Sequence, residues 1–106
     1  MESNLENLEE LFKKMNNDNF DTTSILKWGF YFYGQSQETL QKVWVELTGH
    51  DYNLEELVDS EGEWKLLVTK LDILTPLKLH KRNIAFNELA KFCGADLYDG
   101  WDVERI

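Results

Sequence analysis

The chain has 106 residues, of which 42% are hydrophobic, and this is enough for one domain with a single hydrophobic core. Twenty acidic against eleven basic side chains give a formal net charge of −9. That charge repels nucleic acid and anionic membranes and attracts a basic protein surface, although it is equally compatible with a role in solubility alone. The single cysteine, Cys93, excludes an internal disulfide and a cysteine-rich zinc site.

Targeting and membrane segments are not evident in this sequence. No apolar run approaches the roughly 20 residues that span a bilayer. Residues 1–10 contain acids and no base, which is unlike a signal peptide. We therefore expect a cytoplasmic protein with no membrane contact. We also expect no cofactor.

The N-terminal half predicts a helix, a strand and a second helix. Ser3 begins a capping box before an apolar helical stripe, which predicts a short helix over 4–15. Residues 24–33 are rich in aromatic and branched side chains on both faces, which is typical of a central strand. Ser36 then begins a helix with a buried stripe, and this helix is expected to end near Gly49.

The C-terminal half predicts a β-hairpin, a long helix and a short last strand. Residues 64–73 predict a strand, paired through a turn at 60–62 with a short strand inside the acidic segment. Thr75-Pro76 is a helix start signal. The buried face of this helix is expected to consist of Ala85, Leu89, Phe92 and Cys93. A short strand over 95–98 follows, and Asp99-Gly100 predicts a turn.

This order of elements indicates a fold class. Strand–helix–strand–strand–helix–strand is the ferredoxin-like pattern, which puts two helices on one face of an antiparallel sheet and leaves the other face open. We therefore expect an α+β fold, a ferredoxin-like βαββαβ sandwich with an extra N-terminal helix. Residues 1–19 are assigned to that helix and a linker, and residues 20–106 to the ferredoxin-like domain.

The acidic side chains are concentrated in one segment. Between His50 and Glu63 there are six acids and no lysine or arginine. We expect this segment to be the partner-binding site, because clustered charge steers a surface of opposite charge toward it. The candidate residues are Asp51, Glu55, Glu56, Asp59, Glu61 and Glu63.

Catalytic and metal-binding patterns are weak. Cys93 lies in the last turn of its helix, which disfavours a thiolate, so a buried core position explains it better. His50-Asp51 has no evident third catalytic group. The acids over 96–104 lack the spacing of an EF-hand calcium loop. We therefore expect no catalytic residue, no metal site and no enzymatic activity.

The aromatic side chains of the strands leave an RNA-binding alternative open. Sheets of this type can stack RNA bases on exposed rings, and Tyr31, Tyr33 and Trp64 are the candidates. The net charge has the wrong sign for RNA, and the strand over 64–73 lacks the glycine- and aromatic-rich signature. Core packing or a protein interface is therefore favoured for these rings.

The C-terminal segment over 86–101 resembles the ending of the regulator of ribonuclease E activity B family. There a helix with Leu-Ala, a charged and an aromatic residue leads through a small turn to a four-residue signature. In this chain the signature is Tyr98, Asp99, Gly100 and Trp101. The aromatic strand, the acidic hairpin and the proline after the third strand agree in order, so the resemblance covers about residues 20–104. The sequence departs from the family at Asp102, where glycine is common.

The resemblance implies a ferredoxin-like protein without a catalytic site that docks onto the endoribonuclease initiating mRNA decay and restrains it. We therefore expect a regulatory protein that binds a protein target with a basic surface, with a ribonuclease as the candidate and no direct contact to nucleic acid. An immunity or antitoxin-type binder that neutralises a toxin is the alternative, and RNA binding through the open sheet face is a third. Independently of the family, Trp101 is expected to fold onto the sheet or a helix and lock the C-terminal strand. The oligomeric state stays open.

Overall fold

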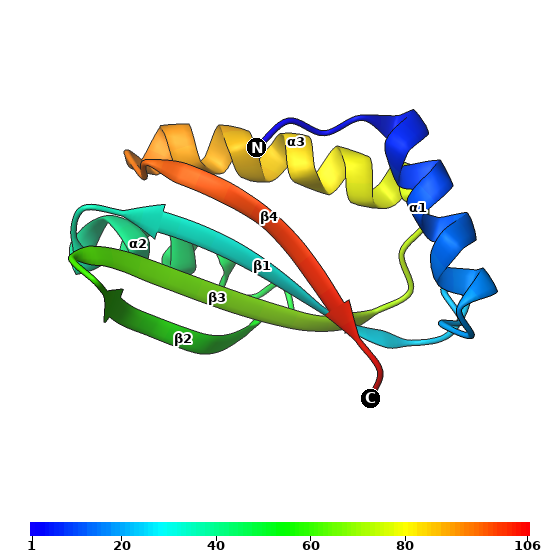
Figure 1. The fold of residues 1–106 in the computed structure, drawn as a ribbon. Helices are drawn as coiled ribbons and strands as arrows, with labels where there is room; N and C mark the ends of the chain where they lie inside the picture. The colour runs from blue at the N-terminus through cyan, green and yellow to red at the C-terminus, as the bar shows by residue number, and fades with distance from the viewer.

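The computed structural model covers residues 1–106, which form three helices and a four-stranded antiparallel sheet. The elements are α1 (Leu5–Asn17), β1 (Leu26–Gly34), α2 (Gln37–Leu47), β2 (Asn53–Ser60), β3 (Glu63–Asp72), α3 (Pro76–Cys93) and β4 (Leu97–Glu104). The sheet order is β2-β3-β1-β4, so β1 is a central strand as predicted (Figure 1). The α+β class and the order of elements are confirmed, and the strand order is compatible with the ferredoxin-like expectation.

Local side chains determine where the helices begin. The side chains of Asn4, Ser36 and Thr75 each accept a hydrogen bond from the backbone amide three residues on, which satisfies an amide that a first helical turn leaves unpaired. Asn4 therefore caps α1 in place of Ser3, whose hydroxyl lies 2.8 Å from His80 Nδ1. None of the three helices combines the length and apolar content that crossing a bilayer requires.

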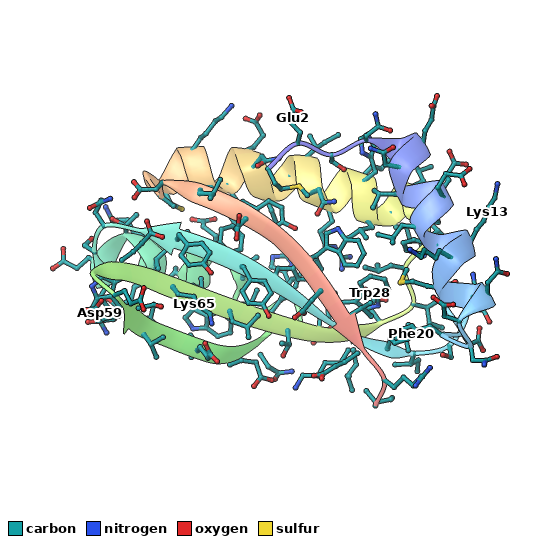
Figure 2. All side chains as sticks on the ribbon, viewed as in Figure 1. Glu2, Lys13, Phe20, Trp28, Asp59 and Lys65 are labelled. Atoms are coloured by element: carbon teal, nitrogen blue, oxygen red, sulfur yellow. The ribbon has the colours of Figure 1, made fainter.

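The hydrophobic core lies between one face of the sheet and the helices. In β1 the buried side chains of Trp28, Phe30 and Phe32 alternate with outward ones, as the period of two predicts. Helix α1 closes one end of this core, close to Trp28 (Figure 2). Phe12 of α1 stacks on Trp28 with ring centroids 5.9 Å apart. The N-terminal helix therefore contributes to the same core as the sheet.

The buried face of α3 differs from the predicted one. It consists of Leu79, Asn83, Phe86, Ala90 and Cys93. Ala85 and Phe92, which were expected inside, are exposed. The prediction failed because polar Asn83 interrupts the apolar stripe. Its amide is nevertheless satisfied, since the Tyr98 hydroxyl donates to Asn83 Oδ1 at 2.6 Å and Asn83 Nδ2 donates to Ser3 Oγ at 3.3 Å.

The last strand is longer than predicted, because Asp99 and Gly100 do not form a turn. Tyr31 faces Gly100 while the next residue, Phe32, faces Tyr98, so Asp99 is an extra residue in β4. This is a β-bulge, which bends a strand without ending it. Gly100 has a φ of 111°, a conformation that side chains disfavour. The Asp-Gly pair therefore serves the bend, and β4 continues beyond it.

Candidate functional site

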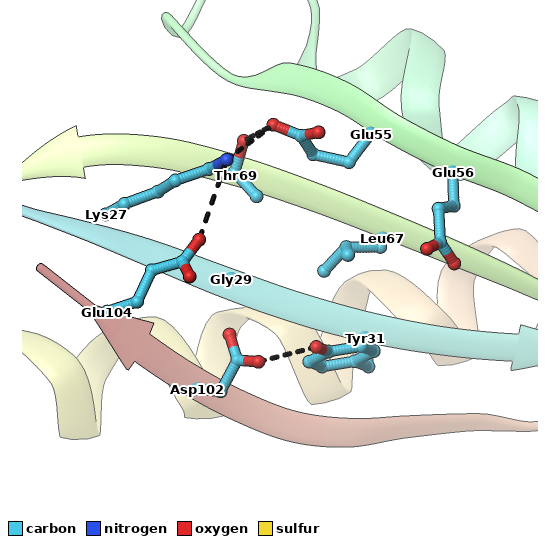
Figure 3. A pocket seen from close by; sticks show the side chains of 9 residues that line it. All are labelled: Lys27, Gly29, Tyr31, Glu55, Glu56, Leu67, Thr69, Asp102 and Glu104. Atoms are coloured by element: carbon cyan, nitrogen blue, oxygen red, sulfur yellow. Dashed lines mark hydrogen bonds and ion pairs between the residues drawn. The ribbon is translucent and has the colours of Figure 1, made fainter. Parts of the chain in front are cut away.

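The sheet face opposite the helices is open and polar. Lys27, Gly29 and Tyr31 of β1 point to this side and line a shallow depression of about 310 Å³ (Figure 3). The other lining residues are Glu55, Glu56, Leu67, Thr69, Asp102 and Glu104. We call this surface the open face. Its lining contains four carboxylates, two from β2 and two from β4, the strands on either side of the central pair.

A bulge in β2 allows two consecutive glutamates to reach the open face. Neighbouring residues of a regular strand point to opposite faces. The register of β2 against β3 shifts between Leu54 and Glu56, which leaves Glu55 as an extra residue. Both Glu55 and Glu56 therefore line the same depression.

Glu55 lies at the centre of a charged cluster. The Lys27 ammonium is 3.1 Å from Glu55 Oε1 and 3.7 Å from Glu104 Oε1, and the Thr69 hydroxyl donates to Glu55 Oε1 at 2.9 Å. The hydrogen bond from Lys27, followed by that from Thr69, lowers the pKa of Glu55. The same carboxylate raises the pKa of Lys27. The pair therefore stays ionised over a wider pH range than free side chains.

The side chain of Asp102 in β4 reaches over the neighbouring central strand β1. The Tyr31 hydroxyl donates to Asp102 Oδ2 at 2.6 Å, and this hydrogen bond raises the pKa of Tyr31 because ionisation would place two negative oxygens in contact. A Cβ atom at Gly29 would collide with Asp102 Oδ1. The absence of a side chain at position 29 therefore makes room for this carboxylate.

Lys65 belongs to the same surface. Its Nζ is 2.8 Å from Glu56 Oε2 and 5.6 Å from the centre of the Tyr31 ring. The hydrogen bond with Glu56 raises the pKa of Lys65. Two lysines thus face four carboxylates, and the difference is a formal charge of −2 on the open face.

The predicted acidic site is divided into two groups by the structure. Glu55 and Glu56 line the open face. The second group surrounds the β2–β3 hairpin and the loop before β2, and consists of Asp51, Asp59, Glu61 and Glu63. Of the six acids in the two groups, Glu56 is half-buried and the other five are exposed. Both groups are therefore accessible to a partner.

Asp102 and Glu104 are site residues that were not predicted from the sequence as part of a partner site. The last strand was predicted to end at Tyr98, so these acids were not connected with the glutamates of β2. In a strand that continues to Glu104, the apolar residues Trp101 and Val103 alternate with the acids. This alternation is the signal that predicts an acidic outward face.

The signature residues lie within β4. Tyr98 is buried, which raises the pKa of its hydroxyl, and it bonds to α3 through Asn83. Trp101 is half-buried, and its ring centroid is 5.6 Å from that of Trp28. Asp99 and Gly100 form the bulge. These contacts favour a structural role for Tyr98 and Trp101.

The remaining candidates are the Cys93 thiol, a metal site and a stacking platform of aromatic rings. Burial raises the pKa of the Cys93 thiol, which disfavours the reactive thiolate. No group of three or more His, Cys, Asp or Glu side chains is close enough to hold a metal ion. Trp64 packs against the core on the helix side of β3, so it does not share a stacking platform with Tyr31 and Tyr33.

Replacing Lys27 by methionine is expected to raise the pKa of Glu55, because the Lys27 hydrogen bond is the largest cause of its depression. The stabilisation from Glu55 is present above its unfolded-state pKa and is lost as the pH falls through the lower folded-state pKa. An NMR titration of the Glu55 carboxyl carbon measures the shift. Thr69→Val should cause a smaller rise, and an unchanged midpoint in Lys27→Met would contradict the assignment.

A family model described as regulator of ribonuclease activity B matches residues 5–103. A search of curated proteins finds no match. The matched range contains all three helices and the sheet as far as Val103, so the relationship extends well beyond the C-terminal signature. The chain therefore belongs to the regulator of ribonuclease activity B family.

Proposed function

We propose that this protein is a non-enzymatic regulator that binds a ribonuclease through protein contacts and inhibits it. Membership of a family of ribonuclease regulators is the observation that carries this proposal. The acidic surface of β2 supports it, because the proteins that handle RNA present basic surfaces which such a surface attracts. We also assign the ferredoxin-like class from the strand order, and a cytoplasmic location from the family's role in regulating ribonuclease activity.

The charge of the open face argues against direct RNA binding, one of the two alternative functions. Four carboxylates on the open face would meet the phosphates of an RNA strand, and the two lysines there are already paired with acids. Direct RNA binding is therefore disfavoured. No specific contact or residue favours a toxin as the target.

Affinity purification from the native host, followed by mass spectrometry, tests the proposed target. A ribonuclease is expected among the partners that are retained at moderate salt and lost at high salt. Recovery of a toxin in its place, or of RNA without a ribonuclease, would contradict the proposal.

Charge reversal of Glu55, Glu56 and Asp59 to lysine is expected to slow association with the recovered ribonuclease about tenfold at low salt, because these acids steer the encounter. The difference should shrink as salt screens the charges. Stopped-flow or surface-based kinetics measures both rates. Reversal of Glu6, Glu9 and Glu10 in α1 is the matched control, since it changes the net charge equally at a different surface. Equal effects of the two variants would exclude steering by β2.

A further inference from the structure

The outer edge of β2 is unpaired. β3 occupies one side of this strand, and no other strand follows on the far side (Figure 1). After the bulge at Glu55, Glu56–Ser60 keeps an unbroken register with β3. The outward backbone amides and carbonyls of this segment therefore form a regular template for a further strand.

The opposite edge of the sheet is less suited to strand addition. The Met1 nitrogen donates to the Tyr98 carbonyl of β4 at 2.8 Å, so the N-terminal residues already occupy part of that edge. The bulge at Asp99 also interrupts the regular pairing of β4. β2 is therefore the edge with a free and regular backbone.

The side chains of β2 define the chemistry of a strand that would pair with it. Leu54 and Val58 are 42% and 43% exposed, and the acids Glu56 and Asp59 lie close to Val58 in the same strand. Cross-strand neighbours interact at about 4.5–5.5 Å between Cβ atoms, and opposite charges there are favourable. A complementary strand therefore offers lysine or arginine together with apolar side chains.

The same charges discourage pairing between two copies of this chain. β2 of one copy against β2 of another would bring Glu56 and Asp59 near their own counterparts, and like charges across strands are destabilising. Each copy also has a formal charge of −9. Edge strands commonly use charge in this way to prevent self-association, while a basic strand is still accepted.

We propose that the β2 edge binds an extended, basic segment of the partner protein as a fifth strand of the sheet. The identity of the partner rests on the proposed function, whereas the binding mode rests on the edge itself. Backbone hydrogen bonds along Glu56–Ser60 would provide affinity, and the acids and apolar side chains, which occur together on each face of β2, would provide selectivity.

A synthetic peptide of Lys-Lys-Val-Val repeats, which presents both residue types on each face of a strand, is the probe; it is long enough to span Glu56–Ser60 and is blocked at both ends. It is titrated into ¹⁵N-labelled protein and followed by NMR. We expect the largest amide shifts and slower hydrogen exchange along β2. Two further peptides are N-methylated at alternate positions, one on the amides that face β2 and one on the amides that face away. The first should bind at least about tenfold more weakly and the second almost unchanged, because only the first loses backbone hydrogen bonds.

Matched variants separate charge from backbone pairing. Glu56→Gln with Asp59→Asn removes two charges, and the amide oxygen introduced by the second change can still accept the turn hydrogen bond that the Gly62 amide gives to Asp59. This double variant is expected to bind the probe about five-fold more weakly. Glu9→Gln with Glu10→Gln in α1, at the opposite end of the molecule from the β2–β3 hairpin, should bind it normally (Figure 1).

Three outcomes would overturn strand addition: equal weakening by both N-methylated peptides, shifts confined to residues outside β2, or dimerisation through β2 in place of peptide binding. The proposed function is tested separately. Edge binding of the probe without a ribonuclease among the host partners would retain strand addition and reject the target. A recovered ribonuclease together with a β2 edge that ignores the probe would retain the target and reject strand addition.

Discussion

Replacing Trp28 by alanine is expected to lower the free energy of unfolding by about 4 kcal/mol. The side chain is 0% exposed and lies between Phe12 of α1 and Trp101 of β4. Its indole N–H also donates to the Asp72 carbonyl at 3.2 Å. Truncation would leave a cavity where α1 and three strands meet, so most of the lost packing cannot be recovered. Urea denaturation followed by circular dichroism measures the change.

Tyr33→Ala provides the control for Trp28→Ala. Tyr33 belongs to the same strand but points to the open face and is only half-buried. Tyr33→Ala is expected to lower the free energy of unfolding by less than half as much as Trp28→Ala, because fewer contacts are lost. Similar losses for the two variants would contradict the placement of the core on one side of β1.

Replacing Asn83 by alanine is expected to lower the free energy of unfolding by about 3 kcal/mol, since it leaves the Tyr98 hydroxyl buried without its acceptor and also creates a cavity. Asn83 is 0% exposed, and the Tyr98 hydroxyl donates to it at 2.6 Å. A double-mutant cycle compares the wild type with Asn83→Leu, Tyr98→Phe and the double variant. The double variant should lose less free energy of unfolding than the sum of the losses of the two single variants. Thermal and urea unfolding of the four proteins measures this coupling, and strictly additive losses would contradict a direct hydrogen bond.

The parts of the fold that the sequence predicted are those governed by short-range patterns. The aromatic and branched side chains of residues 24–33 were sufficient to predict a central strand, and β1 occupies Leu26–Gly34 in the middle of the sheet. Thr75-Pro76 marks the start of α3, and the Thr75 side chain caps this helix. These signals depend on neighbouring residues alone, so no knowledge of the tertiary structure was needed.

The features that were missed depend on long-range contacts. Asn83 faces the core because Tyr98 and Ser3, distant in sequence, satisfy its amide. Asp99-Gly100 has the composition of a turn, but pairing with β1 makes it a bulge. A pattern within one segment contains neither partner, which explains why the buried face of α3 and the end of β4 were predicted wrongly.

The candidate site was predicted in part for the same reason. The sequence identified the acidic segment that contains Glu55 and Glu56, because charge is visible in composition. It could not indicate that a bulge turns both glutamates to one face, or that Asp102 and Glu104 approach them across the sheet. The acidic surface is therefore assembled from two strands that are distant in sequence, and it covers the open face of the sheet as well as the hairpin.

Inhibition is tested by RNA cleavage by the ribonuclease recovered from the native host, measured with increasing amounts of this protein. We expect the wild-type protein to lower the cleavage rate to a plateau and to cleave no RNA by itself. The variant with Glu55, Glu56 and Asp59 changed to lysine should require a markedly higher concentration for the same effect. A cleavage rate that the wild-type protein leaves unchanged, or RNA cleavage by this protein alone, would contradict the proposed function.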